Sequence, residues 1–238
     1  MKKIITNISL TLVTCSLFGF GLPSIPKAGG SDDSKESGGG PSAEVAQEAL
    51  VRDYSKAAAS VLRAQQNFLA AFGNKDKAAA LEVAANNLES SDKPSKQEIA
   101  DAKALSDEAN DEIKNLTSEE ADFSEEGKAY YRAAIPYMAK GVQGLVKLAN
   151  TAKDFIDNAQ SEIKSAGLMG AAKLKKKLDA GLYVAPKIPS LVGDTTKNFK
   201  SLVSYGKKNK ILDPNEESES YLDCLLYTSD AADDRNCG

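Results

Sequence analysis

The chain has 238 residues and a formal net charge of −4, and it contains neither histidine nor tryptophan. Without histidine it has no imidazole base, which excludes Ser-His-Asp and Cys-His catalysis. Its three cysteines, Cys15, Cys224 and Cys237, lie near the two ends, so the long middle part has no thiol for a disulfide or for ordinary zinc, copper or haem ligation. We therefore expect a protein that is not an enzyme, holds no cofactor and is stabilised by packing alone.

Residues 1–28 are predicted to be a secretory signal peptide. The chain starts Met-Lys-Lys and continues with an apolar run to residue 22 that several threonines and serines interrupt. A short basic start before one apolar run is typical of a signal peptide, whereas a permanent span needs about 20 consistently apolar residues. We expect an exported, bacterial protein of the periplasm or the extracellular space.

The sequence Leu-Val-Thr-Cys that ends at Cys15 resembles a bacterial lipoprotein box. Thr14 is larger than the residue usually found before the lipidated cysteine, and the apolar run continues beyond Cys15 through Phe18 and Phe20. We therefore expect Cys15 to be part of the signal and not a lipid anchor. Residues 29–41 follow, mostly glycine, serine and charged residues, and such a composition predicts a flexible linker.

A single helical domain is predicted for residues 42–211, starting with a helix over 43–72. Ser42 is expected to cap its first amides and Gly73 to end it. Apolar residues spaced by four and three mark one face of this helix, at Leu50, Tyr54, Ala57, Val61, Ala64, Phe68 and Ala71, as in a heptad pattern. A short connection then predicts an antiparallel helix over 76–90, with Leu81, Ala85 and Leu88 facing inward.

The third predicted helix starts at a capping box, Ser95 to Glu98, in which each side chain bonds the other residue's free amide. Its outer face carries four carboxylates at Asp107, Glu108, Asp111 and Glu112. These acids could bind a divalent cation, but the alternating spacing of a calcium loop is absent, so a solvated face is favoured. A polar link over 117–124 follows, with capping signals at Thr117 and Ser124.

The fourth predicted helix, over 125–165, is the longest element. Its apolar stripe keeps the four-three spacing at Tyr131, Ile135, Met138, Val142, Leu145, Ala149, Ala152, Ile156, Ala159 and Ile163. Tyr130 and Tyr131 are adjacent and must diverge on a helix, so we expect only one of them in the core. Gly141 and Gly144 permit a close helix contact, and the lysines beside them argue against a membrane span.

The rest of the domain is basic. Residues 171–180 read AAKLKKKLDA and predict a short basic amphipathic helix. A turn or an irregular crossing is expected over 181–189, which contains Pro186 and Pro189, before a last helix over 190–208. Residues 127–211 hold 16 Lys and Arg against 5 Asp and Glu, whereas residues 41–126 hold 9 against 18. Such a split indicates two halves that face each other or a basic surface for an acidic partner.

The C-terminal end falls into two parts. Residues 212–223 form an acidic segment, and residues 224–234 resemble one translated reading frame of a sequencing-library adapter. On that resemblance we expect residues 224–238 not to be native protein, and we leave them out of the fold.

Together these patterns predict an all-α fold: an elongated antiparallel bundle of about five to six helices with coiled-coil-like heptads. The expected function is that of a structural or interaction protein with an unknown protein partner or with self-association. The alternative is a peripheral membrane or lipid-binding protein that uses the basic segment 164–210. Its candidate contacts with an anionic surface are Lys173, Lys175, Lys176 and Lys177. No nucleic-acid-binding motif accompanies them, so no nucleic-acid partner is expected.

Overall fold

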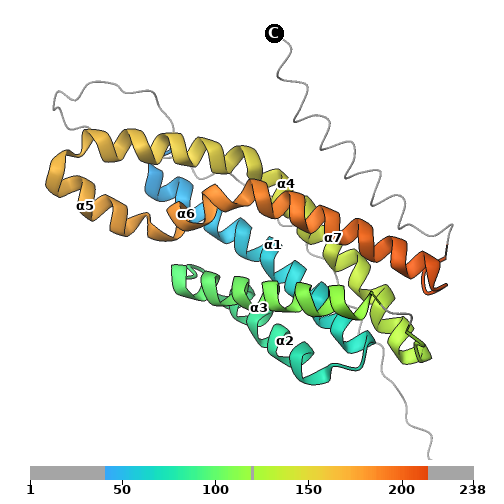
Figure 1. Ribbon diagram of the computed structural model, residues 1–238. Coiled ribbons are helices and arrows are strands. Elements are labelled where there is room, and N and C mark those ends of the chain that lie inside the picture. The colour runs from blue at the N-terminus through green and yellow to red at the C-terminus, as the bar shows by residue number, and fades with distance from the viewer. Residues whose placement is uncertain (1–40, 119–120, 214–238) are drawn as a thin grey trace, which may run out of the picture. The chain divides into compact units, whose positions relative to one another are not determined.

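The computed structural model describes residues 41–118 and 121–213, and these residues confirm the all-α class, with helices and no strand among them. The helices are α1 (Ala43–Ala71), α2 (Lys75–Ser90), α3 (Lys96–Leu116), α4 (Glu125–Ser165), α5 (Gly167–Lys177), α6 (Asp179–Val184), the short 3₁₀ helix η1 (Ala185–Lys187) and α7 (Ile188–Lys208) (Figure 1). The expected signal peptide, nearly all of the linker and the adapter-like tail lie outside the described residues.

The main contact of the fold joins α1 to α4, which lie side by side and run in opposite directions (Figure 1). Near the end of α1, the Ala71 carbonyl meets Gly127 at the start of α4, and in the middle Val61 meets Gly141. At the start of α1, the Ala43 amide donates to Glu162 Oε1 at 2.7 Å. The two apolar stripes predicted from the sequence face this contact, and Phe68, Tyr131 and Val142 are fully buried in the core.

Glycines explain why the two helices come so close. A Cβ atom on Gly141 would lie 2.6 Å from Val61 Cγ2, and one on Gly144 would lie 2.8 Å from the Ala57 Cβ. Both separations are shorter than side-chain atoms tolerate, so the observed distance requires glycine at both positions. The close contact predicted from Gly141 and Gly144 is confirmed.

Several predicted helix ends are confirmed. Ser95 and Glu98 form the expected capping box, in which the Glu98 carboxylate accepts from the Ser95 amide at 2.7 Å, and this bond lowers the pKa of Glu98. Ser124 Oγ accepts from the Gly127 amide at 3.0 Å and starts α4 where expected. Gly73 follows α1 with φ of 80°, in the left-handed region that glycine adopts without strain.

Two capping predictions are wrong. The Ser42 side chain makes no capping hydrogen bond, and the first amide of α1 donates to Glu162 of α4. Thr117 does not start a helix; it ends α3, and its hydroxyl donates to the Ile113 carbonyl at 2.8 Å. Both predictions relied on a local sequence signal. In the structure the Ala43 amide finds an acceptor that is distant in sequence, and the Thr117 hydroxyl bonds a carbonyl of the preceding helical turn.

The turn or irregular crossing predicted over 181–189 is also wrong, because this stretch is helical in α6, η1 and the start of α7. Pro186 and Pro189 each occupy the second residue of a helix. Proline is tolerated in a first turn because the amide that it lacks has no acceptor there. The prolines therefore mark the starts of η1 and α7.

An aromatic cluster joins the end of α1, the start of α4 and the end of α7. Phe68 and Tyr131 lie edge to face with ring centres 4.9 Å apart, as do Phe72 and Phe123. The Tyr131 hydroxyl donates to the Leu202 carbonyl of α7 at 2.7 Å, and burial raises the pKa of this phenol above its ordinary value. These contacts fix α7 on α4.

Candidate functional site

Helix α5 is the element with the least buried surface, since none of its residues is buried. Its inner side is marked by the partly buried Gly170, Ala171 and Leu174, and Leu178 follows it fully buried. At 100° per residue, Leu168, Met169 and Lys173 project from the opposite side. Leu168 is 96% exposed and Met169 is 80% exposed. We call residues 164–177 the α5 tip.

The four lysines predicted as anionic-surface contacts differ in their ion pairing: three have no ion-pair partner among the described residues and one has a partner. Lys173, Lys175 and Lys176 are exposed, and no ion pair joins them to any residue that the structure describes. Lys177 is exposed too, but its ammonium group pairs with Glu44 of α1 at 2.8 Å. Three of the predicted residues are therefore available for a partner, and the fourth holds the helix to α1.

Gln47 of α1 holds the junction between α5 and α6. Its Nε2 donates to the Lys177 carbonyl at 2.9 Å, and its Oε1 accepts from the Gly181 amide at 2.9 Å. At the other end of α5, Gly167 has φ of 65°, which lets the chain reverse after α4. Helix α5 is thus bounded by the turn at Gly167 on one side and by the two Gln47 hydrogen bonds on the other.

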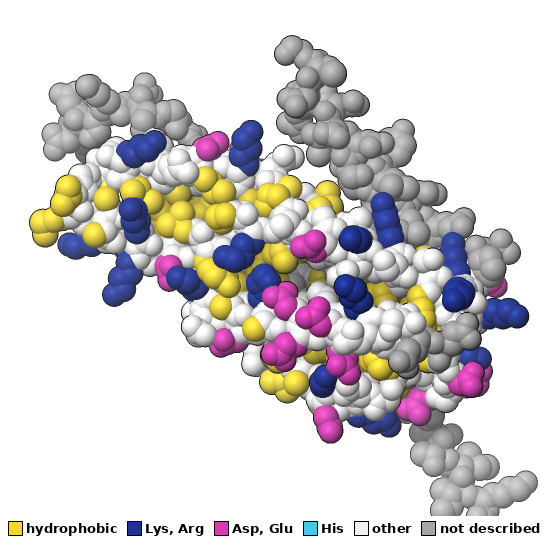
Figure 2. Space-filling view, in the orientation of Figure 1, with side chains coloured by type: hydrophobic (Ala, Val, Ile, Leu, Met, Phe, Trp, Pro, Cys, Tyr) yellow, Lys and Arg dark blue, Asp and Glu magenta, His cyan; other side chains and the backbone are white. Residues whose placement is uncertain are grey.

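Figure 2 shows that hydrophobic side chains gather on the surface over the end of the molecule where α4 and α5 lie, with Lys and Arg around them. Acidic side chains gather elsewhere in this view, over α2 and α3. The sequence between residues 163 and 178 contains five lysines and no acidic residue. The tip therefore combines exposed apolar side chains with positive charge.

The apolar part of this site was missed at the sequence level. Leu168 and Met169 lie between Gly167 and Gly170, and the glycines were interpreted only as a break between helices. Two large apolar residues within a glycine-bracketed turn are a usable signal, because such a turn is exposed and offers them little to pack against.

The contact between the acidic and the basic half is mainly apolar in the part of the chain that the structure describes. In the Lys177–Glu44 pair the basic half supplies the lysine. In the Lys96–Asp179 pair, 3.0 Å apart, the acidic half supplies the lysine and the basic half supplies the carboxylate. The α1–α4 contact itself consists of buried apolar residues and glycines. Apolar packing joins the halves, and Lys173, Lys175 and Lys176 of the α5 tip have no ion-pair partner among the described residues.

The acidic face of α3 is largely a solvated surface with local pairing. Glu108 and Asp111 are exposed, Asp107 pairs with Lys103 at 2.5 Å, and Glu112 pairs with Lys77 at 2.8 Å. Over residues 41–118 and 121–213, no three acidic, histidine or cysteine side chains gather as metal ligands would.

Tyr130 and Tyr131 diverge as predicted, since Tyr131 is fully buried and Tyr130 is 37% exposed. None of the helices in the described part of the chain has the length and apolar composition needed to cross a membrane. Comparison of the chain with models of protein families, with curated proteins and with solved structures finds no match.

Proposed function

We propose that this chain is an exported, non-enzymatic interaction protein that attaches to an anionic membrane surface through the α5 tip. In this proposal the helices form an elongated antiparallel bundle with coiled-coil-like heptads, which presents the tip at one end. The observation that carries the proposal is the exposure of Leu168 and Met169 beside Lys173, Lys175 and Lys176, which have no ion-pair partner among the described residues.

The two components of the tip favour a membrane surface for different reasons. Burying a Leu or Met side chain is worth up to about 1.5–3 kcal/mol, and Leu168 and Met169 are almost fully exposed without a partner. A lysine near an anionic bilayer gains about 1 kcal/mol. Its long aliphatic stem can lie along the apolar boundary while the ammonium group stays among the headgroups. Attachment by both components is strong only on anionic lipid.

Charge decides between a membrane and a protein partner. A protein interface usually has few charged residues at its centre, and lysine is among the residues depleted there. The α5 tip has lysines around its apolar residues and no acidic residue to balance them. An extended anionic surface accommodates such a pattern without requiring each lysine to find its own partner.

The proposal is tested by flotation of the full-length protein with lipid vesicles. One set of vesicles contains phosphatidylglycerol and phosphatidylcholine, and the other contains phosphatidylcholine alone, each at low and at high salt. We expect binding to the anionic vesicles only, and weaker binding at high salt because ions screen the attraction.

Matched variants locate the binding surface. Replacing Lys173, Lys175 and Lys176 by Gln should weaken binding roughly a hundredfold, since about 3 kcal/mol of attraction is lost. A control variant that replaces Lys114, Lys197 and Lys200 by Gln changes the net charge equally at exposed positions of α3 and α7, and it should bind much more strongly than the tip variant. Equal loss in both variants would show that net charge alone is responsible and would contradict the proposal.

The double variant Leu168→Ser/Met169→Ser separates the membrane from self-association. It should lower vesicle binding without changing the mass of the protein in sedimentation equilibrium. If the wild-type protein ignores anionic vesicles and instead forms an oligomer that this variant dissociates, the tip is a protein interface and the membrane proposal fails.

A further inference from the structure

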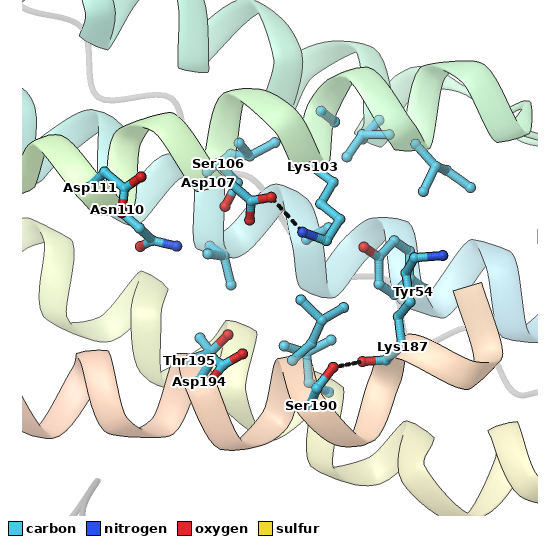
Figure 3. A pocket seen from close by; sticks show the side chains of 18 residues that line it. Tyr54, Lys103, Ser106, Asp107, Asn110, Asp111, Lys187, Ser190, Asp194 and Thr195 are labelled. Carbon is cyan, nitrogen blue, oxygen red and sulfur yellow. Dashed lines mark hydrogen bonds and ion pairs between the residues drawn. The ribbon is translucent and has the colours of Figure 1, made fainter. Parts of the chain in front are cut away.

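A cleft of about 490 Å³ opens between α3 and α7, over a floor supplied by α1 and α4 (Figure 3). Small residues leave this space open, since Ala58 of α1 and Ala102 of α3 line it and contribute no atoms beyond Cβ. Val61, Leu62 and Leu145 complete the apolar floor, and Leu191 of α7 adds an apolar side chain to one wall. This volume and this lining are typical of a site for a small molecule.

A largely buried tyrosine, whose hydroxyl group has no hydrogen-bond partner among the described residues, lines this cleft. Tyr54 is 5% exposed, lines the cleft, and its hydroxyl makes no hydrogen bond with any residue that the structure describes. Figure 3 shows this hydroxyl turned toward the space between α3 and α7. Burial, with smaller effects of Tyr183 and Asp107, raises the pKa of Tyr54 to about 12. The hydroxyl oxygen does not belong to the fully buried polar atoms that lack a partner, so it is accessible from the cleft and can form a hydrogen bond with an atom of a ligand.

The two lysines of the cleft already have partners. Lys103 pairs with Asp107 one turn further along α3, at 2.5 Å. The Lys187 ammonium group donates to the Tyr183 carbonyl at 3.0 Å and lies 3.6 Å from the centre of the Tyr183 ring. Lys103 is therefore paired with a carboxylate, and Lys187 is held by a carbonyl group and an aromatic ring.

Two carboxylates of the cleft are not engaged. Asp111 of α3 and Asp194 of α7 both line it, and neither forms an ion pair with a described residue. Figure 3 shows them on facing helices at the same end of the cleft, while Tyr54 lies toward the other end. The cleft thus has an anionic end, an apolar middle and a hydroxyl end.

The geometry points to a binding site for a small, apolar molecule that carries a protonated amine at one end and a hydrogen-bonding oxygen at the other. The amine lies between Asp111 and Asp194, the apolar body covers the floor around Leu62, and the oxygen bonds the Tyr54 hydroxyl. This site lies on other elements than the α5 tip and does not depend on membrane attachment.

Isothermal titration calorimetry of the full-length protein tests the site with four probes that share one alkyl chain. The probes are an α,ω-amino-octanol, octylamine, octanol and octanoate. We expect amino-octanol to bind most tightly and octylamine next, with octanol weaker than both. Octanoate should not bind detectably, because its charge repels the free carboxylates. Equal affinity for octylamine, octanol and octanoate, or no binding by any probe, would overturn the proposal.

Variants assign the two ends of the ligand. Asp111→Asn/Asp194→Asn should weaken octylamine binding by at least about tenfold, because charge-assisted hydrogen bonds are lost, and it should leave octanol unchanged. Tyr54→Phe should lower the affinity for amino-octanol to that for octylamine and leave octylamine unchanged. The control Asp154→Asn/Asp157→Asn, two exposed carboxylates of α4 outside the cleft, should bind octylamine like the wild type.

Circular dichroism shows whether each variant is folded. All of these substitutions are nearly isosteric and should preserve the helical spectrum. If the control variant weakens octylamine binding as much as Asp111→Asn/Asp194→Asn does, the cleft does not hold the amine. If Tyr54→Phe leaves amino-octanol binding unchanged, the free hydroxyl is not part of the site.

Discussion

The substitution Gly141→Ala tests the close contact between α1 and α4. In an exposed helix interior, replacing Gly by Ala stabilises a protein by about 1 kcal/mol. At Gly141 the new Cβ would lie 2.6 Å from Val61 Cγ2 and 3.2 Å from both the Ala57 carbonyl oxygen and the Val61 amide nitrogen. Val61 has a stiff, branched side chain and the other two atoms are backbone, so the helices must move apart.

The cost of that movement exceeds the gain in helix propensity. Overpacking a core by one methyl group costs about 1–3 kcal/mol, so we expect Gly141→Ala to lower the free energy of unfolding by about 1–2 kcal/mol. The matched control is Gly193→Ala in α7, where a Cβ meets nothing within 4 Å. That variant should raise the free energy of unfolding by up to about 1 kcal/mol.

Urea denaturation followed by circular dichroism measures both variants. The double variant Val61→Ala/Gly141→Ala should recover part of the loss, because removing the valine methyl groups makes room for the new Cβ. If Gly141→Ala stabilises the protein as much as Gly193→Ala does, α1 and α4 are not in close contact and the described packing is refuted.

Three further variants test the core and its ends. Leu145→Ala should cost about 2–5 kcal/mol because this leucine is buried, whereas the exposed Lys147→Ala should change the urea midpoint little; similar small effects would mean that the stripe does not face a core. Glu162→Ala should cost about 1 kcal/mol, since the Ala43 amide loses its acceptor, and an unchanged urea midpoint would contradict this bond. Burial raises the pKa of Tyr131, so the contribution of the neutral phenol to stability is complete below about pH 10 and is lost as pH rises further. The Tyr131→Phe variant should therefore be less stable than the wild type at pH 7, but its stability should fall less steeply above pH 10. An equal fall in both proteins would contradict the burial of this phenol.

The longest helix could be predicted from sequence because its signals are local. Ser124 caps its first turn and an unbroken stripe of apolar residues follows, so both ends of α4 were placed correctly. Gly141 and Gly144 lie directly beside the stripe residues Val142 and Leu145, and these small residues correctly indicated a close neighbour. Local caps and periodic burial depend on residues a few positions apart, and such patterns can be seen in one sequence.

Contacts between distant residues could not be predicted in this way. The Ala43 amide donates to Glu162, 119 positions away, and the capping bond predicted for Ser42 is not formed. Lys177 belongs to an unbroken basic run, yet Glu44 of α1 pairs with it. The cleft likewise combines Tyr54 with Asp111 and Asp194 from three helices, and no pattern within any one helix indicates that assembly.

A single tryptophan at the α5 tip tests the central proposal most directly, because the chain has none of its own. The full-length Met169→Trp variant is mixed with anionic vesicles that contain brominated acyl chains, which quench indole fluorescence on contact. The control is Val83→Trp, at an exposed position of α2. Membrane attachment by the α5 tip predicts a blue shift and quenching for Met169→Trp and neither for Val83→Trp. Unchanged emission from Met169→Trp at saturating anionic lipid, or equal quenching of both variants, would contradict it.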